Sequence, residues 1–335
     1  MQSFKKSFFV LFFGVLLVYF GIACKAAKAE TKPIFKVTLV DSTRAAELIT
    51  TDKSDHYFDQ ISALEMSIQM KKSEGFKDRS SALKAFIPFL KTQVSNPNAA
   101  DKAYVDSMFF YVKKGLELLN PALLIDEVNI VKIKLDHYGA GTFYTRENTI
   151  FIPEDAFKKD WKSNITTMYH ELWHILSRKY PGLRKSAYGL IGFESHGIKL
   201  KFDEALSSKV LTNPDGANYD YAIKLQEDLV IPILTSKFPK YTSSSPAFFD
   251  YINFDFYDIA ADGRVDTIPA ALKSMEGFFE KIKDNTQYII HPDEIMADNF
   301  ALAAEAFESK KYDQFSPGGK ELIDEFTKVL IAFKQ

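Results

Sequence analysis

The spacing of apolar and polar residues predicts that the first third of the chain is mainly helical. Between about Ser42 and Asn120, apolar residues recur at three- and four-residue steps, notably in 58–70, 81–94 and 103–119, which is the spacing of amphipathic helices. Residues 31–42, which precede this stretch, have the composition of a β-strand and its exit. We therefore predict a mainly helical N-terminal region over residues 30–124.

The pattern changes after about residue 125. Segments 128–138 and 141–153 are rich in β-branched and aromatic residues, which is typical of short strands joined by turns. Helical spacing returns at 163–179, where Pro181 and Gly182 end it, and at 292–307 and 319–333. Residues 183–250 are less regular, with loops predicted at 211–220 and 241–247. The pattern as a whole predicts an α+β fold in which residues 125–335 form a catalytic domain.

The first 29 residues have the pattern of an export signal. Met1–Lys6 carries two lysines and no acid, residues 8–23 are almost wholly apolar, and Ala27-Lys28-Ala29 has the form that signal peptidase cuts. A retained transmembrane anchor is the alternative, because the run is close to the shortest length that spans a bilayer. Gly21-Ile22-Ala23-Cys24 also resembles the lipoprotein box of bacteria, in which the signal ends before an acylated cysteine. We expect an exported protein, periplasmic, extracellular or lipid-anchored to the cell envelope.

Composition narrows the classes of partner. The 335 residues are 46% hydrophobic and include 30 Phe and 16 Tyr, which is enough to bury a sizeable core. The 42 basic and 44 acidic residues nearly balance, and no basic stripe stands out, so nucleic acid is not an expected partner. Cys24 is the only cysteine. Removal of the signal would leave neither a disulfide nor a cysteine-ligated metal.

The segment His170-Glu171-Leu172-Trp173-His174 carries the clearest chemistry. Residues four apart lie one turn above each other on a helix, so His170 and His174 can each give a ring nitrogen to one zinc ion. Glu171, beside the first ligand, can accept a proton from water at the metal. Leu172 is about 200° around the helix from His170, so we predict that the apolar stripe packs while the histidines face a cleft. The alternative is two helix histidines satisfied locally without a metal.

A catalytic zinc needs a third protein ligand. His196, His291 and the acidic residues are the candidates. In residues 291–302 (HPDEIMADNFAL), Pro292 begins a helix on which Glu294 and Asp298 share a face. Glu294 can bind the metal while Asp298 accepts the other ring N–H of a ligand histidine. His291 is an alternative ligand, a group that polarises the substrate carbonyl in the transition state, or a structural residue of this helix.

These two segments resemble the gluzincins, the zinc peptidases whose third ligand is a glutamate. HExxH followed by ExxxD has this form, and Glu294-x-x-Ala297-Asp298 is similar to a motif of integral-membrane CAAX-prenyl and heat-shock metallopeptidases. The resemblance implies a zincin-like fold with a small sheet and an active-site helix. It also implies that His170, His174 and Glu294 are zinc ligands, that Glu171 is the general base, and that Asp298 is an acid that accepts the other ring N–H of a ligand histidine. It covers roughly 25 residues, and the gap between the two motifs is longer than in those families.

Two further roles stay open in the sequence. A donor to the oxyanion would be a tyrosine, because no histidine follows His291; Tyr251, Tyr257 and Tyr288 precede Glu294. A substrate strand would pair with an edge strand near the active-site helix. Residues 149–153 are the candidate for that edge, with an interior strand as the alternative, and the loop 211–220 either overhangs the cleft or is a surface turn.

The sequence therefore predicts an exported zinc metallopeptidase that hydrolyses peptide bonds of a peptide or protein substrate. Zinc is the expected cofactor, and contact with a membrane is expected only through an N-terminal lipid anchor. The rival prediction is a zinc-containing binding or scaffold protein of the cell envelope without activity. Glu171 argues against the rival, because a structural zinc site has no need of a base beside its first ligand.

Overall fold

The computed structural model describes residues 35–216, 218–271, 275–309 and 314–335. The predicted export signal, with Cys24, lies outside these residues. Within them, no helix combines the length and the apolar character needed to cross a membrane. The predicted mixture of helices and small sheets is confirmed, with 46% helix and 18% strand.

The first sheet has four strands in the order β1–β2–β4–β3. β1 (Lys36–Leu39), β2 (Glu127–Ile133) and β4 (Thr149–Pro153) are parallel, and β3 (Tyr144–Arg146) pairs antiparallel with β4 at the edge. β4 pairs with β2 along one edge and with β3 along the other, and all five of its residues are buried. Of the two alternatives for residues 149–153, the structure therefore has the interior strand, and β3 forms the edge.

Five helices lie between β1 and β2 in the sequence: α1 (Ser42–Leu48), α2 (Tyr57–Gln60), α3 (Ala63–Gln69), α4 (Arg79–Lys91) and α5 (Ala99–Leu119). They match the predicted helical region. β1 nevertheless pairs with β2, and the described residues form one compact unit. The pattern of the sequence therefore changes near residue 125, but the residues on both sides of this position belong to the same compact unit.

A second, antiparallel sheet occupies much of the region predicted to be irregular. It contains β5 (Phe193–Ser195), β6 (Val210–Leu211), β7 (Tyr221–Leu225), β8 (Asp228–Ser236) and β9 (Ile252–Asp258), with β8 at its centre. Two features of the sequence explain why this sheet was not predicted. The β7–β8 turn has Gln226 at φ 57° in place of the usual Gly or Asn, and Pro232 lies inside β8, where a central strand rarely carries proline.

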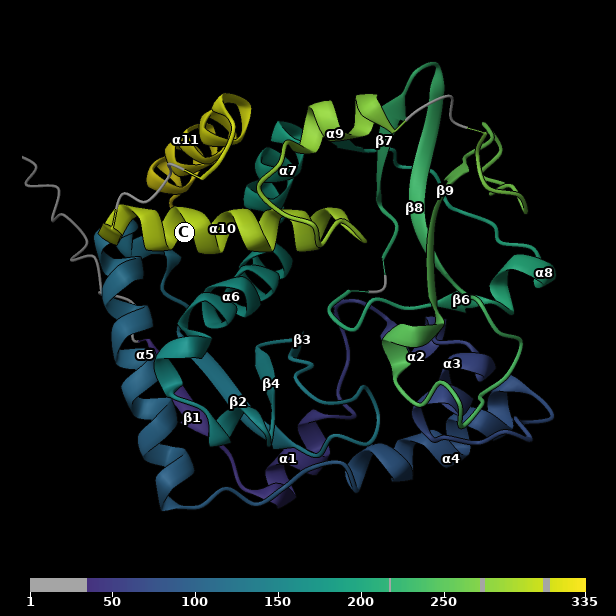
Figure 1. The fold of residues 1–335 in the computed structure, drawn as a ribbon, viewed down its shortest axis with the longest axis horizontal. Coiled ribbons are helices and arrows are strands. Elements are labelled where there is room, and N and C mark those ends of the chain that lie inside the picture. Colours follow the sequence, from purple (N-terminus) through teal and green to yellow (C-terminus); the bar gives the residue numbers. More distant parts are fainter. Residues whose placement is uncertain (1–34, 217, 272–274, 310–313) are drawn as a thin grey trace, which may run out of the picture. The chain divides into compact units, whose positions relative to one another are not determined.

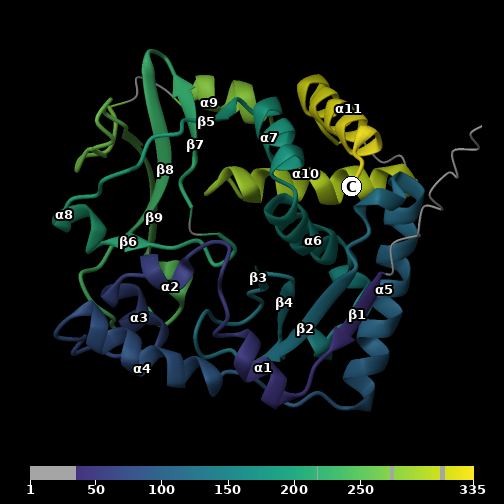
Figure 2. The same cartoon turned by 180° about the vertical axis from the view of Figure 1, so that it is seen from behind.

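The remaining helices are α6 (Ile165–Lys179), α7 (Pro181–Leu190), α8 (Glu204–Ser207), α9 (Glu276–Ile282), α10 (Pro292–Ser309) and α11 (Pro317–Ala332). α6 packs mainly against α5, α7 and α10, whereas α8 lies beside the second sheet (Figure 1). Pro181 does follow the end of α6, but it also begins α7, a position that proline favours. Figures 1 and 2 show α6 between α10 and the first sheet, with the second sheet on the side away from α5. Trp173 of α6 packs edge-on against Phe326 of α11 at 5.2 Å between ring centroids.

Candidate metal centre

Helix α6 brings the two histidines together one turn apart, with 4.8 Å between their ring centroids. The prediction that both face a cleft is only half right. His170 and Glu171 line a cleft of about 470 Å³, whereas His174 is completely buried. The reason is that α10 packs across α6 and covers the side of the helix on which His174 lies.

Glu294, in the first turn of α10, faces both histidines. Its Oε2 atom lies 3.0 Å from His170 Nε2 and 3.5 Å from His174 Nε2. The donor atoms of the three residues all lie within 4.8 Å of one another. Tetrahedral zinc with bonds of 2.0–2.1 Å would separate neighbouring donor atoms by about 3.3 Å. The spacing of the three side chains is therefore that of ligands around one small cation.

A carboxylate holds the far side of each imidazole. His170 Nδ1 donates to Asp298 Oδ1 at 2.7 Å, and His174 Nδ1 donates to Asp293 Oδ2 at 2.7 Å. These bonds turn each Nε2 atom toward Glu294 and fix the tautomer that a metal ligand needs. The sequence singled out Asp298 but not Asp293. Asp293 is offset from Glu294 by one residue, and only the crossing of α10 over α6 brings it to His174.

The loop between β6 and β7 supplies two further side chains that the sequence did not assign to the site. Asn213 Nδ2 donates to Glu294 Oε1 at 2.6 Å, and Asp215 Oδ1 lies 4.0 Å from His174 Nε2. Both residues are buried. The loop is thus neither an overhang nor a surface turn, because it is inserted beside the histidines. In the sequence, the Asn-Pro and Asp-Gly pairs indicate a turn. They do not indicate what the turn contacts, so the sequence did not predict that this loop contributes to the site.

The charges of the centre are strongly coupled. Burial disfavours a charged His170, but hydrogen bonds to Asp298 and Glu294 outweigh it and raise the pKa of His170 to about 10. Burial likewise opposes the charge on His174, yet Glu294, Asp215 and Asp293 hold its pKa well above the ordinary value. The protonated, positively charged form of both histidines is thus favoured, because acidic groups surround them.

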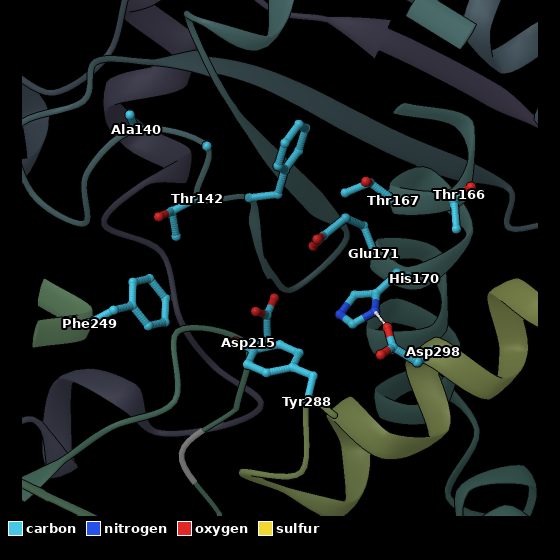
Figure 3. A pocket seen from close by; sticks show the side chains of 12 residues that line it. Ala140, Thr142, Thr166, Thr167, His170, Glu171, Asp215, Phe249, Tyr288 and Asp298 are labelled. Atoms are coloured by element: carbon cyan, nitrogen blue, oxygen red, sulfur yellow. Dashed lines mark hydrogen bonds and ion pairs between the residues drawn. The ribbon is translucent and has the colours of Figure 1, made fainter. Parts of the chain in front are cut away.

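Glu171 and Asp215 face each other across the cleft (Figure 3). Burial, followed by repulsion from Asp215, raises the pKa of Glu171 to about 8. Burial raises the pKa of Asp215 to about 6, although His174 acts in the opposite direction. A cation bound between the histidines would favour the ionised form of both carboxylates.

The other predicted candidates lie away from the donor atoms. His291 caps α10: its Nδ1 accepts from the backbone N–H of Asp293 at 3.1 Å, and its Nε2 donates to the carbonyl of Asn218 at 3.1 Å. With both ring nitrogens engaged, His291 is placed as a structural residue and not as a ligand. His196 is similarly occupied by the carbonyl of Tyr219 at 2.6 Å.

Of the three tyrosines that the sequence left open, Tyr288 lines the cleft. Its ring stacks on His170 with 6.1 Å between centroids and an angle of 24°. Tyr251 is fully buried among apolar residues, and its hydroxyl accepts from the backbone N–H of Thr242. Tyr257 packs in a separate apolar cluster of the second sheet.

Unsatisfied buried atoms test whether these residues suit a metal. His174 Nε2 and Glu171 Oε2 are buried and form no hydrogen bond, and such groups are costly unless an ion or water meets them. Imidazole nitrogens and a carboxylate are also the donor set that zinc accepts. The residues His170, His174 and Glu294 therefore fit a divalent cation.

Comparison of the chain with protein-family models, with curated proteins and with solved structures finds no match.

Proposed function

We propose that this protein is an exported zinc metallopeptidase of the gluzincin type. The observation that carries the proposal is the convergence of His170, His174 and Glu294 from α6 and α10, with Glu171 beside them on the cleft. A purely structural zinc site has four protein ligands and no cleft. Here a buried carboxylate faces the open side of the ligand set, which favours catalysis.

The chemistry follows from where the side chains lie. Zinc held by His170, His174 and Glu294 would lower the pKa of a coordinated water to around 7. Glu171 then accepts the proton of the attacking water and passes it to the leaving amine. Of the three tyrosines considered, Tyr288 is the one that lines the cleft, and its hydroxyl can donate to the oxyanion formed at the carbonyl carbon.

The arrangement of the first sheet supports a zincin-like interpretation of the fold. β3 is an antiparallel edge strand, and residues 140–143, which lead into it, line the cleft with His170 and Glu171. An extended peptide can add to such an edge through its backbone. A peptide bound in this way would lie beside α6, as the proposed peptide hydrolysis requires.

Replacement of Glu171 by Gln tests the function directly. The amide cannot accept a proton but leaves the three proposed ligands in place, so zinc content should stay level. Cleavage of a broad peptide library should fall by about 10²–10⁴-fold, the usual contribution of a general base. Wild-type protein that binds zinc, cleaves nothing and behaves like the Gln variant would decide for the scaffold protein.

Export is a separate part of the proposal. Mass spectrometry of protein from its native host should find Glu30 as the first residue or an acylated Cys24, because both segments match processing signals. An intact Met1 in the mature protein would contradict both outcomes and favour a retained membrane anchor.

A further inference from the structure

The candidate metal centre contains a second group of donor atoms beside the first. Glu171, His174 and Asp215 each offer one nitrogen or oxygen atom, and these three atoms lie within 4.8 Å of one another, the same limit as in the first group. All three residues are buried, with exposed fractions of 3%, 0% and 5%. Glu171 and Asp215 line the cleft (Figure 3), which gives an ion from solvent access to them.

The fold holds Asp215 beside His174. The Oδ1 atom of Asp215 accepts hydrogen bonds from the backbone N–H of Thr145 at 2.6 Å and from the Thr145 hydroxyl at 3.2 Å. The same atom lies 4.0 Å from His174 Nε2, with which it forms an ion pair when the ring is protonated. The loop that carries Asp215 is tied to α3, because Glu65 accepts from the backbone N–H of Thr212 at 2.7 Å. The carboxylate therefore needs no rearrangement of the loop to meet an ion at His174.

Two atoms of this group have no hydrogen-bond partner within the described part of the chain. They are Glu171 Oε2 and His174 Nε2, and both are buried. Such atoms are costly unless an ion or a water molecule meets them. The Nδ1 atom of His174 donates to Asp293, so Nε2 of the neutral ring carries the lone pair that can bind a cation. The unpartnered atoms thus indicate a ligand independently of the acidic character of the group.

The two groups of donors share His174. Because Asp293 occupies its Nδ1 atom, either group can use only Nε2, and one lone pair binds one ion. The groups are therefore alternative positions for a cation. They also differ in chemistry, since the first has two imidazoles and one carboxylate and the second has one imidazole and two carboxylates. Imidazole ligands suit zinc, whereas carboxylate ligands suit harder cations such as Mn²⁺.

Carboxylates dominate the surroundings of the two imidazoles. Five lie there, those of Glu171, Asp215, Asp293, Glu294 and Asp298. Asp293 and Asp298 accept from the Nδ1 atoms behind the rings, whereas the other three belong to the two groups of donors. One divalent cation offsets two negative charges, so carboxylates stay in excess whichever position the ion takes. This excess favours a position with two carboxylate ligands.

We propose that Glu171, His174 and Asp215 form a second cation position, which excludes the first because both use His174 Nε2. The second position favours a divalent cation that prefers oxygen ligands, and the first favours zinc. An ion in the second position has Glu171 as a ligand, and that carboxylate cannot then accept a proton from water. This consequence for catalysis rests on the proposed peptidase function, whereas the position itself does not.

Manganese binding to zinc-free, full-length variants tests the position, because electron paramagnetic resonance distinguishes bound from free Mn²⁺. His170→Ala removes a ligand of the first position alone, so this variant should still bind one Mn²⁺ per chain. Adding either Asp215→Asn or Glu171→Gln should weaken Mn²⁺ binding by at least about tenfold. Loss of even an outer partner of a ligand costs about 10–100-fold, and these substitutions remove a ligand.

Asp220→Asn in the His170→Ala background is the matched control, because it removes an exposed acid close to the same loop and should leave Mn²⁺ affinity unchanged. Near-UV circular dichroism before metal is added shows which variants are folded, and Glu171→Gln serves if Asp215→Asn does not fold. Wild-type protein that holds one Zn²⁺ should take up no Mn²⁺ at the centre, since His174 is already used.

His170→Ala protein that binds no Mn²⁺, or binds it equally well after Asp215→Asn and Glu171→Gln, would overturn the second position. Binding of Zn²⁺ and Mn²⁺ together at the wild-type centre would overturn their mutual exclusion. If zinc-loaded wild-type protein cleaves peptides while His170→Ala binds no Mn²⁺, the inference fails and the proposed function stands. If Mn²⁺ binds as expected but zinc-loaded wild-type protein cleaves no peptide, the inference stands and the proposed function fails.

Discussion

Asp293 accepts hydrogen bonds from four side chains at the centre: His174, Ser177, Trp173 and Tyr188. His174 and the other donors more than offset the effect of its burial and lower its pKa to about 2. One carboxylate therefore both orients a proposed ligand and ties α6 and α7 to α10. Asp298 is less enclosed, since its side chain is 34% exposed, and its hydrogen bonds within the described part of the chain are to His170 and Thr286.

This difference predicts different effects of the two Asp→Asn substitutions. Each should weaken zinc binding by about 10–100-fold, because each removes the acceptor behind a ligand histidine. Only Asp293→Asn should also lower the free energy of unfolding of the metal-free protein, by about 1–3 kcal/mol, as buried donors lose their partner. Zinc competition titrations and thermal unfolding measure the two quantities. Equal stability of the two variants would show that Asp293 has no structural role.

His291 is predicted to affect stability and not metal binding. Its side chain caps α10, and both of its ring nitrogens are bonded to backbone atoms, those of Asp293 and Asn218. His291→Ala should therefore leave zinc affinity nearly unchanged and lower stability by about 0.5–2 kcal/mol, the usual cost of a lost cap. Loss of zinc in this variant, together with its retention in Glu294→Ala, would reassign the third ligand to His291.

The helices α5 and α6 approach each other closely at Gly115. A Cβ atom at this position would fall on the hydroxyl of Tyr169, and the ring of Tyr169, which belongs to α6, is buried. The missing side chain of a helix residue thus sets how near α6 lies to its neighbour.

Gly115→Ala should consequently destabilise the protein by about 1–3 kcal/mol, the range for an overpacked core, even though alanine favours a helix over glycine. Gly189→Ala in α7 is the matched control, since a Cβ there meets no atom within 4 Å, and it should be neutral or stabilising by up to about 1 kcal/mol. Chemical denaturation of both variants measures the effect. A stable Gly115→Ala protein would mean that Tyr169 moves aside without cost.

Across the molecule as a whole, Glu65 connects the N-terminal helices with the loop that enters the candidate metal centre. This residue of α3 accepts hydrogen bonds from the backbone N–H of Thr212 and from Gln69 at 3.0 Å. Burial raises its pKa from about 4.5 to about 7, although these bonds oppose the shift.

The raised pKa predicts the sign of a pH effect on stability. Between pH 4.5 and 7 the folded protein keeps a proton on Glu65 that the unfolded chain has lost, so the free energy of unfolding should fall as pH rises through this range. The contribution of Glu65 is on the order of 3 kcal/mol. Glu65→Gln should flatten the decline, as urea unfolding at several pH values would show. A variant with the same pH dependence as the wild type would exclude Glu65 as its source.

The sequence by itself determined what depends on neighbours along the chain. The period of apolar residues located the main helices, and the four-residue spacing within HELWH placed two histidines on one face, since helix geometry fixes both. The same geometry put Glu294 and Asp298 on one side of a second helix. The hairpin β7–β8 was not predicted, because its turn lacks the residues that usually indicate a hairpin.

The tertiary structure decided everything that depends on how separate elements meet. The crossing of α10 over α6 buries His174 and brings Asp293 behind it, and the loop from the second sheet carries Asn213 and Asp215 into the centre. The strand at the sheet edge was likewise settled by pairing and not by composition. Contacts between residues some 40 to 120 positions apart leave no periodic trace in the sequence, because packing and not local backbone geometry brings such residues together.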